Sequence, residues 1–330
     1  MMKSLQLLSA VLALAFLGAT GAAPARAAQE GHFDKTLTVN GPVDLDVNTG
    51  SGNITIHPGG AGQVQIHAII RANDGWFSGG DVEKRIQYIE EHPPIEQDGN
   101  TITIGHEQDR DLMRNIAISY EITTPAETHL HSATGSGNQT VEGIAGPVDS
   151  TTGSGDLRLT SIGSGVTART GSGGIKLDGV KGNLRAAAGS GDIRAEGVTG
   201  AITASTGSGD VTLTQAGGGD VEVTTGSGTV ELNGAKGAVH IGTGSGNVSA
   251  EGTPTGDWRL RTGSGDLTVT LPQQSSFELH AHASSGSIHS DFPITMQGTI
   301  SPRNLEGKVG AGGPVIELRT SSGAIHIESR

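Results

Sequence analysis

Acidic and amide side chains recur at one position of a glycine-rich repeat, where a column of carboxylates could bind calcium. Asp156, Asp192 and Asp210 each follow a Gly-Ser-Gly tripeptide and directly precede an apolar residue. The calcium-binding nonapeptide of β-roll proteins instead places its Asp two residues before the apolar position. The phase therefore favours capping of the turn amides, which Asp and Asn both provide. Calcium binding stays an alternative, because aligned carboxylates about 4.8 Å apart repel unless something compensates them. The same position also holds Asn53, Asn138, Asn247 and Asp266.

Three basic residues form a second candidate site, two positions after this column. Arg158, Lys176 and Arg194 are spaced 18 residues apart, so stacked coils would place them in one stripe. The stripe could hold an acidic glycan, and it could equally be a solvated face of mixed charge. Polysaccharide lyases on β-helices combine Lys or Arg with calcium-binding carboxylates. Catalysis is not favoured here, because no long irregular loop covers the stripe and aromatic residues make up only 3% of the chain.

Histidines near the end of the chain are a third candidate. His289 and His326 occupy the same position in two degenerate copies of the repeat. If residues 291–313 loop out, these two coils become neighbours and the imidazoles come within metal-binding range. A metal site needs three or four converging ligands, so exposed surface histidines are the favoured interpretation. His280 with His282, and His129 with His131, form further outward pairs.

Other motifs that would indicate an enzyme are missing from the sequence. A phosphate-binding loop opens a helix and carries Lys followed by Ser or Thr, whereas these glycine turns repeat and are followed by strands. No G-x-S-x-G nucleophile motif occurs, and the chain has no cysteine for thiol chemistry. The sequence therefore predicts a protein that is not an enzyme and that uses no cofactor.

The Gly-Ser-Gly repeat must position all of these residues, and its spacing predicts the fold. Apolar residues recur about every nine positions, usually with a second apolar residue two positions on, as in Leu157 with Leu159. That alternation is the pattern of strands, so each 18-residue unit holds two short strands. Stacked units bury one narrow core. We predict an all-β, single-chain β-solenoid of 18-residue two-strand coils, right-handed by the preference of parallel crossovers. The tripeptide begins at Gly135, Gly153, Gly171, Gly189, Gly207, Gly226, Gly244 and Gly263, with an isolated early copy at Gly50.

Threonine precedes nearly every tripeptide, and Ala188 and Ala283 are the exceptions. Strand alternation from Val148 places Thr152 on the inward side at the corner of its coil. Stacked threonines there can hydrogen-bond along the solenoid axis and satisfy the turns. An ice-binding or substrate-binding array would have to face solvent on a flat sheet, so the internal role is favoured.

The first 28 residues have the pattern of a signal peptide. Lys3 precedes an apolar run from Leu5 to Leu17, and Ala25-Arg26-Ala27 offers a cleavage site. No later stretch approaches the roughly 20 apolar residues of a membrane span. A net charge of −13 argues against nucleic acid or an anionic membrane face as the main partner. We therefore expect an exported protein in the periplasm, outside the cell or at the cell envelope.

Two regions follow the predicted signal peptide: residues 29–132, with irregular strands, and the repeat ladder at 133–330. Residues 71–98 are an insertion in which Val82, Ile86 and Ile89 fall at helical spacing. Asp81 stands at the expected helix start, and prolines at 93 and 94 stop the helix. Such a helix could cover the open first coil and block edge pairing, and Trp76 and Phe77 are expected to join this cap.

Several of these features together resemble the DUF4097 family of bacterial envelope proteins, the adhesin-like toast-rack domains. They are Val43-Asp44-Leu45-Asp46-Val47, the tripeptide at Gly50, the helical insertion, a strand from Ile116 ending in Thr-Pro-Ala, and the Thr-Gly-Ser-Gly-Asp ladder. The resemblance covers nearly all of the chain after residue 28. It implies a β-solenoid at the cell envelope, and it supplies no catalytic residues.

The expected function is a non-catalytic exported scaffold that binds an envelope glycan or protein through a flat sheet face. A polysaccharide lyase-like enzyme that uses the basic stripe, and a calcium-stabilised structural solenoid, stay as alternatives. The last strand, Ala324 to Ser329, is expected to be an exposed edge through which copies of the chain could associate.

Overall fold

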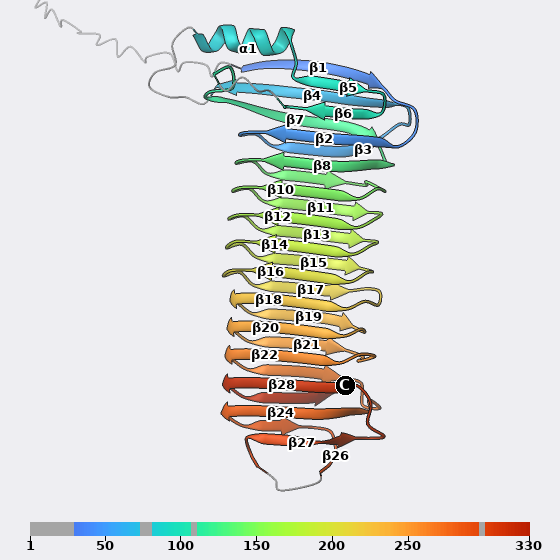
Figure 1. Cartoon of the computed structure of the whole chain (residues 1–330), viewed down its shortest axis with the longest axis vertical. Helices are drawn as coiled ribbons and strands as arrows, with labels where there is room; N and C mark the ends of the chain where they lie inside the picture. The colour runs from blue at the N-terminus through green and yellow to red at the C-terminus, as the bar shows by residue number, and fades with distance from the viewer. Residues whose placement is uncertain (1–29, 73–80, 107–110, 297–300) are drawn as a thin grey trace, which may run out of the picture.

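A computed structural model describes residues 30–72, 81–106, 111–296 and 301–330, and it has two long sheets that enclose one hydrophobic core (Figure 1). One helix, α1 (Asp81–Glu91), lies at the N-terminal end. Sheet A contains β1 (Glu30–Thr38), β3 (Ile54–Gly59), β4 (Gln63–Ala72), β7 (Ile116–Pro125), β9 (Gln139–Glu142), β11 (Leu157–Ile162), β13 (Ile175–Val180), β15 (Ile193–Val198), β17 (Val211–Gln215), β19 (Val230–Ala235), β21 (Val248–Gly252), β23 (Leu267–Leu271), β25 (Ile288–Ser290) and β29 (Ile325–Ser329). Sheet B contains β2 (Val43–Thr49), β5 (Ile95–Asp98), β6 (Thr101–Ile104), β8 (Thr128–Thr134), β10 (Val148–Thr152), β12 (Val166–Thr170), β14 (Leu184–Ala188), β16 (Ile202–Thr206), β18 (Val221–Ser227), β20 (Val239–Ser245), β22 (Trp258–Ser264), β24 (Phe277–Ser285), β26 (Ile294–Thr295), β27 (Asn304–Val309) and β28 (Val315–Ser322).

Each regular coil contributes one strand to each sheet, which confirms the predicted solenoid of two-strand coils. Val148 of β10 pairs with Val166 of β12, and Leu157 of β11 pairs with Ile175 of β13, each 18 residues on and parallel. Buried side chains alternate with exposed or half-buried ones along these strands, except that two successive outward positions precede the last residue of β11 and of β13. The buried rows of the two sheets face each other, so each coil completes its core only against its neighbours.

The threonine before each tripeptide lies inside the corner, as predicted. Thr170 is 5% exposed, and its hydroxyl donates a hydrogen bond of 2.9 Å to the carbonyl of Gly155 in the preceding coil. The same hydroxyl oxygen accepts from the amide of Gly173 in its own turn, at 3.1 Å. The threonines therefore form an internal ladder that links successive coils. Equivalent hydroxyl-to-carbonyl bonds are made by Thr134, Thr152, Thr206, Thr225, Thr243, Thr262 and Thr320.

Removing one rung of this ladder should destabilise the solenoid, and adding one should stabilise it. Thr170→Val keeps the shape but leaves a buried carbonyl and a half-buried amide without their partner, at a cost of about 1–3 kcal/mol. Ala188→Thr supplies a hydroxyl where the ladder is interrupted and should add about 1 kcal/mol. Urea unfolding measures both free energies. Equal stability of Thr170→Val and wild type would contradict a structural role for the hydroxyl.

The N-terminal end is closed by an excursion of the chain between its first two coils. The coil of β2 and β3 stacks directly on the coil of β8 and β9, with Val43 opposite Thr128 and Ile54 opposite Gln139. The intervening chain places β7 and β4 beyond β3 in sheet A, and β6 and β5 beyond β2 in sheet B, while the first strand, β1, pairs with β4 at the outer edge of sheet A. Burial in this cap raises the pKa of the Tyr120 hydroxyl.

Helix α1 caps the outermost strand of sheet A, as the periodicity predicts. Val82, Ile86 and Ile89 are its buried residues. The carboxylate of Glu90 accepts a hydrogen bond of 2.9 Å from the backbone amide of His32 in β1. The helix thus covers the strand and occupies an edge amide that could otherwise pair with another chain. The predicted contribution of Trp76 and Phe77 falls outside the described residues.

The C-terminal end departs from the expected order of coils. The last coil of the sequence, β28 and β29, lies between the coil of β22 and β23 and the coil of β24 and β25. The segment Ala324 to Ser329 is therefore an internal strand flanked by β23 and β25, not an exposed edge. After Leu271 the chain leaves space for one coil and first forms the coil of β24 and β25. It then returns and fills that space with β28 and β29. The end of the stack is formed instead by β24 and β25, with β27 and β26 pairing antiparallel beyond β24.

Candidate functional site

The predicted basic stripe is present on the outer face of sheet A. Arg158, Lys176 and Arg194 are directly opposite one another on β11, β13 and β15, and all three are exposed. In the neighbouring row, Asp178 of β13 is opposite Glu196 of β15. Positive and negative side chains thus alternate along these strands, which gives the face a mixed charge.

The Asp and Asn column serves the backbone, as predicted, but it bonds to amides of the next coil instead of capping its own turn. Asp156 accepts a hydrogen bond of 2.8 Å from the amide of Gly174, and Asp192 accepts one of 2.9 Å from the amide of Asp210. Each amide belongs to the next coil rather than to the same turn, so the column links coils along the axis. Asp210 continues the pattern with the amide of Thr229 at 2.7 Å. Further members of this ladder are Asn53, Asn138, Asn247 and Asp266.

A second ladder of the same kind occupies the opposite corner and was not predicted from the repeat. Asn183, Asp220 and Asp257 accept hydrogen bonds of 3.0 Å from the amides of Ala201, Ala238 and Val315, respectively. Its members are irregular in type and occur in only some coils. The signal in the sequence was the recurrence of Asp or Asn directly before the sheet B strands.

The two late histidines are neighbours, as predicted from the looping out of the chain between them. His289 of β25 is directly opposite His326 of β29, with ring centroids 6.5 Å apart and planes tilted by 56°. Asp291 lies 3.4 Å from His289. Across the described ranges, no group of three or more His, Asp or Glu side chains is arranged to hold a metal ion.

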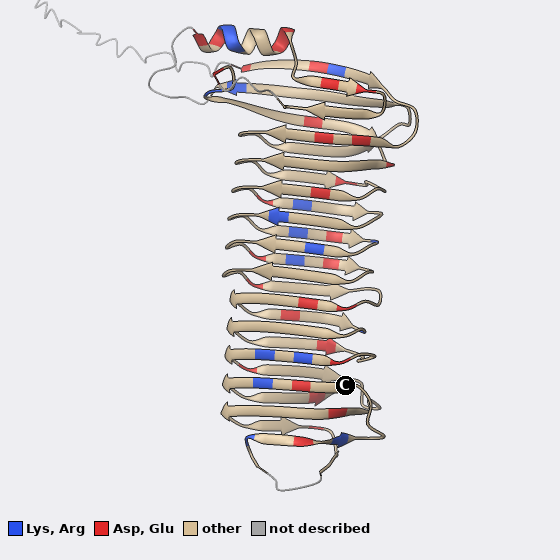
Figure 2. Ribbon diagram, viewed as in Figure 1, with Lys and Arg blue, Asp and Glu red and all other residues tan. Residues whose placement is uncertain are grey.

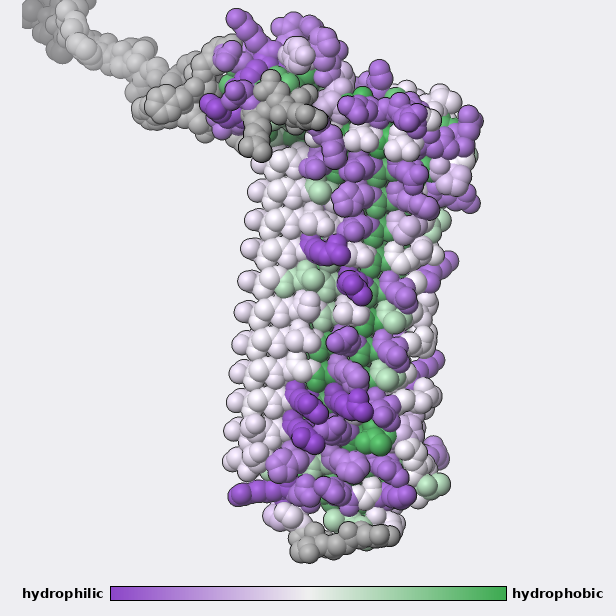
Figure 3. Space-filling view, viewed as in Figure 1, coloured by the Kyte–Doolittle hydropathy of each residue, from purple (hydrophilic) through white to green (hydrophobic). Residues whose placement is uncertain are grey.

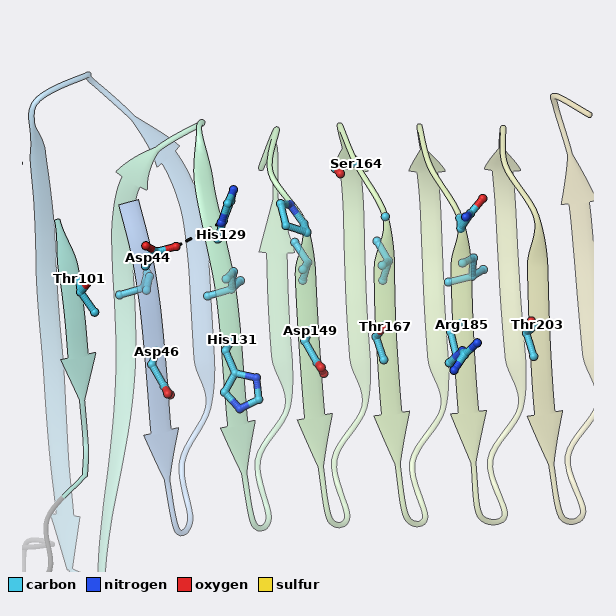
Figure 4. Close-up of a pocket in the computed structure, with 18 of the residues that line it drawn as sticks. Asp44, Asp46, Thr101, His129, His131, Asp149, Ser164, Thr167, Arg185 and Thr203 are labelled. Carbon is cyan, nitrogen blue, oxygen red and sulfur yellow. Dashed lines mark ion pairs between the residues drawn. The ribbon is translucent and has the colours of Figure 1, made fainter. Parts of the chain in front are cut away.

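A concave feature lies on the outer face of sheet B, where an axial groove of about 850 Å³ crosses β6, β2, β8, β10, β12, β14 and β16. Pro147, Gly165, Asn183 and Ala201 form one wall. The other wall contains Asp149, Thr167, Arg185 and Thr203, and the floor between them includes Val148, Val166 and Leu184. Figure 4 shows the residues of the second wall on successive strands. Figure 3 shows a hydrophobic strip running down this face between hydrophilic side chains.

The groove has a polarised upper end, where carboxylates and imidazoles face each other. Asp44 and His129 are opposite each other on β2 and β8, and their side chains form an ion pair of 3.2 Å (Figure 4). His131 lies between Asp46 and Asp149 in the same row. This end offers both hydrogen-bond donors and acceptors to a ligand, and further along the row Arg185 adds a cation.

These groove residues were missed as a site because their chemistry is mixed. In the sequence, His129 and His131 stand out only as an outward pair. The outward positions of the sheet B strands hold Asp, His, Thr and Arg in no repeating order. The groove arises from the small residues of its first wall, including Gly165 and Ala201, which leave the space beside the second wall open.

The arrangement favours binding of an extended molecule. Parallel strands at a spacing of about 4.8 Å present one wall residue each, so an elongated ligand along the axis would meet a new pair of side chains at each coil.

None of the helices among residues 30–72, 81–106, 111–296 and 301–330 is long and apolar enough to cross a membrane.

Comparison with known proteins relates the chain to a single family. The model of the family described as Toastrack DUF4097 matches residues 36–218 and 198–328. No curated protein matches the sequence.

Three solved structures are similar. A candidate cell adhesion protein from Clostridium sporogenes ATCC 15579 has a TM-score of 0.24 and 12% identity, over 91% of this chain and 100% of that one. A candidate adhesin from Bacteroides fragilis NCTC 9343 has a TM-score of 0.32 and 12% identity, over 91% and 97%. Another, from Parabacteroides distasonis ATCC 8503, has a TM-score of 0.36 and 10% identity, over 90% and 97%.

The two family matches overlap and together span the first coil, the cap, the regular ladder and the last coil. The features that first suggested the resemblance, the Gly-Ser-Gly turns and the helical insertion, both lie within these matches. The chain therefore belongs to the Toastrack DUF4097 family.

Proposed function

We propose that this protein is a non-catalytic, adhesin-like scaffold that binds an extended partner, a glycan or a protein of the bacterial envelope, along the groove of sheet B. The observation that carries the proposal is the groove itself, which runs along the axis across seven neighbouring strands. An open, elongated groove suits a linear partner better than a compact small molecule, because small-molecule sites enclose most of their ligand.

The roles of the polar side chains support binding rather than turnover. The carboxylates of Asp156 and Asp192, which a lyase-like mechanism would need beside the basic stripe, are engaged with backbone amides of the next coil. In the groove, Asp44 is paired with His129, and Asp149 is paired with Arg169 at 3.2 Å. These contacts fix the side chains as part of a rigid face. Less side-chain entropy is then lost when a ligand binds, so the entropic cost of binding is lower.

Export and residence at the envelope belong to the proposal as well. The signal-peptide pattern of residues 1–28 supports export. Family membership supports the adhesin-like role. The Asp and Asn ladders at the two corners and the buried threonines would stabilise an exported chain that has no cysteine for disulfides.

Filling the groove should abolish binding. Thr167→Trp places a large ring in the second wall of the groove, whereas the matched change Thr212→Trp places the same ring on the outer face of sheet A. We expect wild type and Thr212→Trp to retain a protease-treated envelope polysaccharide fraction or an envelope protein fraction saturably, and Thr167→Trp to lose at least about 90% of it, since about 1.4 kcal/mol corresponds to a tenfold change in affinity.

The measurement is capture on immobilised protein, followed by sizing of the bound material. Retained material of unchanged size supports a scaffold, and shortened chains would favour the lyase-like alternative instead. Absence of binding to every fraction by the wild-type protein would contradict the proposal. Equal binding by Thr167→Trp and Thr212→Trp would move the site away from the groove.

A further inference from the structure

A cluster of arginines lies on sheet B near the end of the stack opposite the cap. Arg259 and Arg261 are on β22, and Arg319 is on the adjacent β28 (Figure 2). All three guanidinium groups approach one carboxylate, that of Glu317, at 3.6, 2.9 and 2.6 Å, respectively. The Glu317 side chain is only 15% exposed, whereas the arginine side chains are 45%, 58% and 60% exposed. The carboxylate therefore lies beneath the guanidinium groups and orients them.

The cluster holds more hydrogen-bond donors than its own acceptors can use. Each guanidinium carries five N–H donors, and one carboxylate offers about four acceptor positions. Asp257 adds a distant contact, 3.7 Å from Arg259, and one of its oxygens already accepts from the amide of Val315. The Nε2 atom of His240 lies 3.1 Å from Nη1 of Arg259 and engages one further donor. The result is a local excess of positive charge on a chain whose net charge is −13. Arginine forks of this kind match the geometry of carboxylate and sulfate groups.

A hollow beside the cluster provides room for such a group. Gly242 occupies the outward position of β20 directly opposite Arg261 and has open space where a side chain would stand. The hollow has a volume of about 510 Å³, and Arg261, Arg319 and His282 line it together with hydroxyl-bearing side chains. Those hydroxyl groups belong to Thr224, Ser284 and Ser321, among others. A ligand there would meet cations on one side and hydroxyl groups on the other.

The cluster and the groove lie on one continuous row of the same face. Thr203, the last wall residue of the groove, is opposite Glu222, which is followed in register by His240 and then Arg259. A linear ligand that leaves the groove along the axis therefore reaches the cluster after two further strands.

We propose that this cluster binds the acidic groups, carboxylate or sulfate ester, of a linear acidic glycan that also occupies the groove. The inference rests on the proposed function and names the chemistry of its partner. A local cation site within an acidic surface selects for a ligand with a few spaced anionic groups. A nucleic acid or an anionic membrane would instead need a broad positive field. The hydroxyl groups around the hollow suit a sugar, which presents hydroxyl groups next to its acidic group.

The test measures the binding of four defined polymers to the full chain by titration calorimetry. Oligogalacturonate presents carboxylates, dextran sulfate presents sulfate esters, neutral dextran presents neither, and polyglutamate presents carboxylates on a peptide. We expect binding of at least one acidic glycan, none of neutral dextran, and weakening with added salt. Loss of a charge-assisted contact in Arg261→Gln or Arg319→Gln should weaken binding about 10-fold to 100-fold.

Two further variants make the result specific. Gly242→Val fills the hollow without changing charge, and its side chain meets no other atom within 4 Å at the first carbon, so loss of binding there reports the hollow rather than misfolding. Arg71→Gln removes an exposed arginine on β4 in the cap and should bind as tightly as wild type.

The inference is overturned if neither acidic glycan binds, if polyglutamate binds as tightly as the glycans, or if the Arg261, Arg319 and Gly242 variants bind like wild type. In each of these cases, capture of an envelope fraction that Thr167→Trp abolishes would still support the proposed function. The failure of one proposal is thus distinguishable from the failure of the other.

Discussion

Replacing Gly155 with alanine is expected to prevent the coils from stacking and to destabilise the protein by more than about 3 kcal/mol, above the usual cost of overpacking. A Cβ atom at this position would lie 1.8 Å from the carbonyl oxygen of Gly137 in the preceding coil. The obstacle is backbone, which cannot rotate away as a side chain would. The spacing cannot widen either, because hydrogen bonds such as that from the Gly153 amide to the Thr134 carbonyl, at 3.1 Å, hold the coils together.

The same contact recurs at the second glycine of every tripeptide in the ladder, which explains why the residue is repeated. The corresponding distances to the preceding carbonyl oxygen are 1.9 Å at Gly173 and 1.8 Å at Gly191. Since repeat stacks fold through nearest-neighbour contacts, Gly155→Ala should separate the coils on either side. Urea unfolding monitored by circular dichroism measures the loss of stability, and limited proteolysis should show first cleavage near residue 155.

Gly218→Ala is the matched control for this prediction. A Cβ atom at Gly218 would meet nothing within 4 Å, so the variant should be neutral or more stable by up to about 1 kcal/mol, because alanine restricts the unfolded chain. Similar unfolding of Gly155→Ala and Gly218→Ala would show that close coil contact is not the reason for the glycines.

The regular part of the fold could be predicted because each local signal carries its own physical cause. The tripeptide glycines mark the corner where coils approach most closely, and alternation around Leu157 and Ile175 fixes which face is buried. The threonine ladder could be predicted from strand alternation alone. Thr152 is four positions after the buried Val148, so its side chain points to the same face. Helix α1 could be predicted equally well, because Asp81 marks the start and the prolines mark the end of an apolar stripe at helical spacing.

The parts that could not be predicted depend on contacts between residues far apart in sequence. The groove forms where small side chains of one row leave space beside another, and no single strand shows this. The arginine cluster was missed because Arg259 and Arg261 lie on one strand, whereas Arg319 joins them only through the displaced last coil. Sequence order placed that coil at the end of the stack, and nothing in residues 315–329 distinguishes an internal coil from a terminal one.

The position of the last coil leads to the second large effect, which concerns removal of residues 315–330. This deletion takes away both strands between the coil of β22 and β23 and the coil of β24 and β25. Ile316, Leu318, Ile325 and Ile327 are each fully buried there. Their loss removes on the order of 10 kcal/mol of apolar burial, taken at about 1.5–3 kcal/mol for each side chain.

A terminal coil and an internal coil predict different outcomes for this deletion. Loss of a terminal coil would only shorten the stack and leave β24, β25 and β27 folded. Loss of an internal coil separates β24 from β22, so β24, β25 and β27 should lose their support and become sensitive to protease while the strands from β8 to β21 stay protected, because repeat stacks unfold locally. Limited proteolysis with mass spectrometry distinguishes the two. Removal of Arg330 alone, an exposed residue that pairs with Glu251, is the control and should leave the pattern unchanged. Protection of β24, β25 and β27 in the deletion variant would show that β24 can stack on β22 directly, and that the last coil is not needed to hold the end of the solenoid.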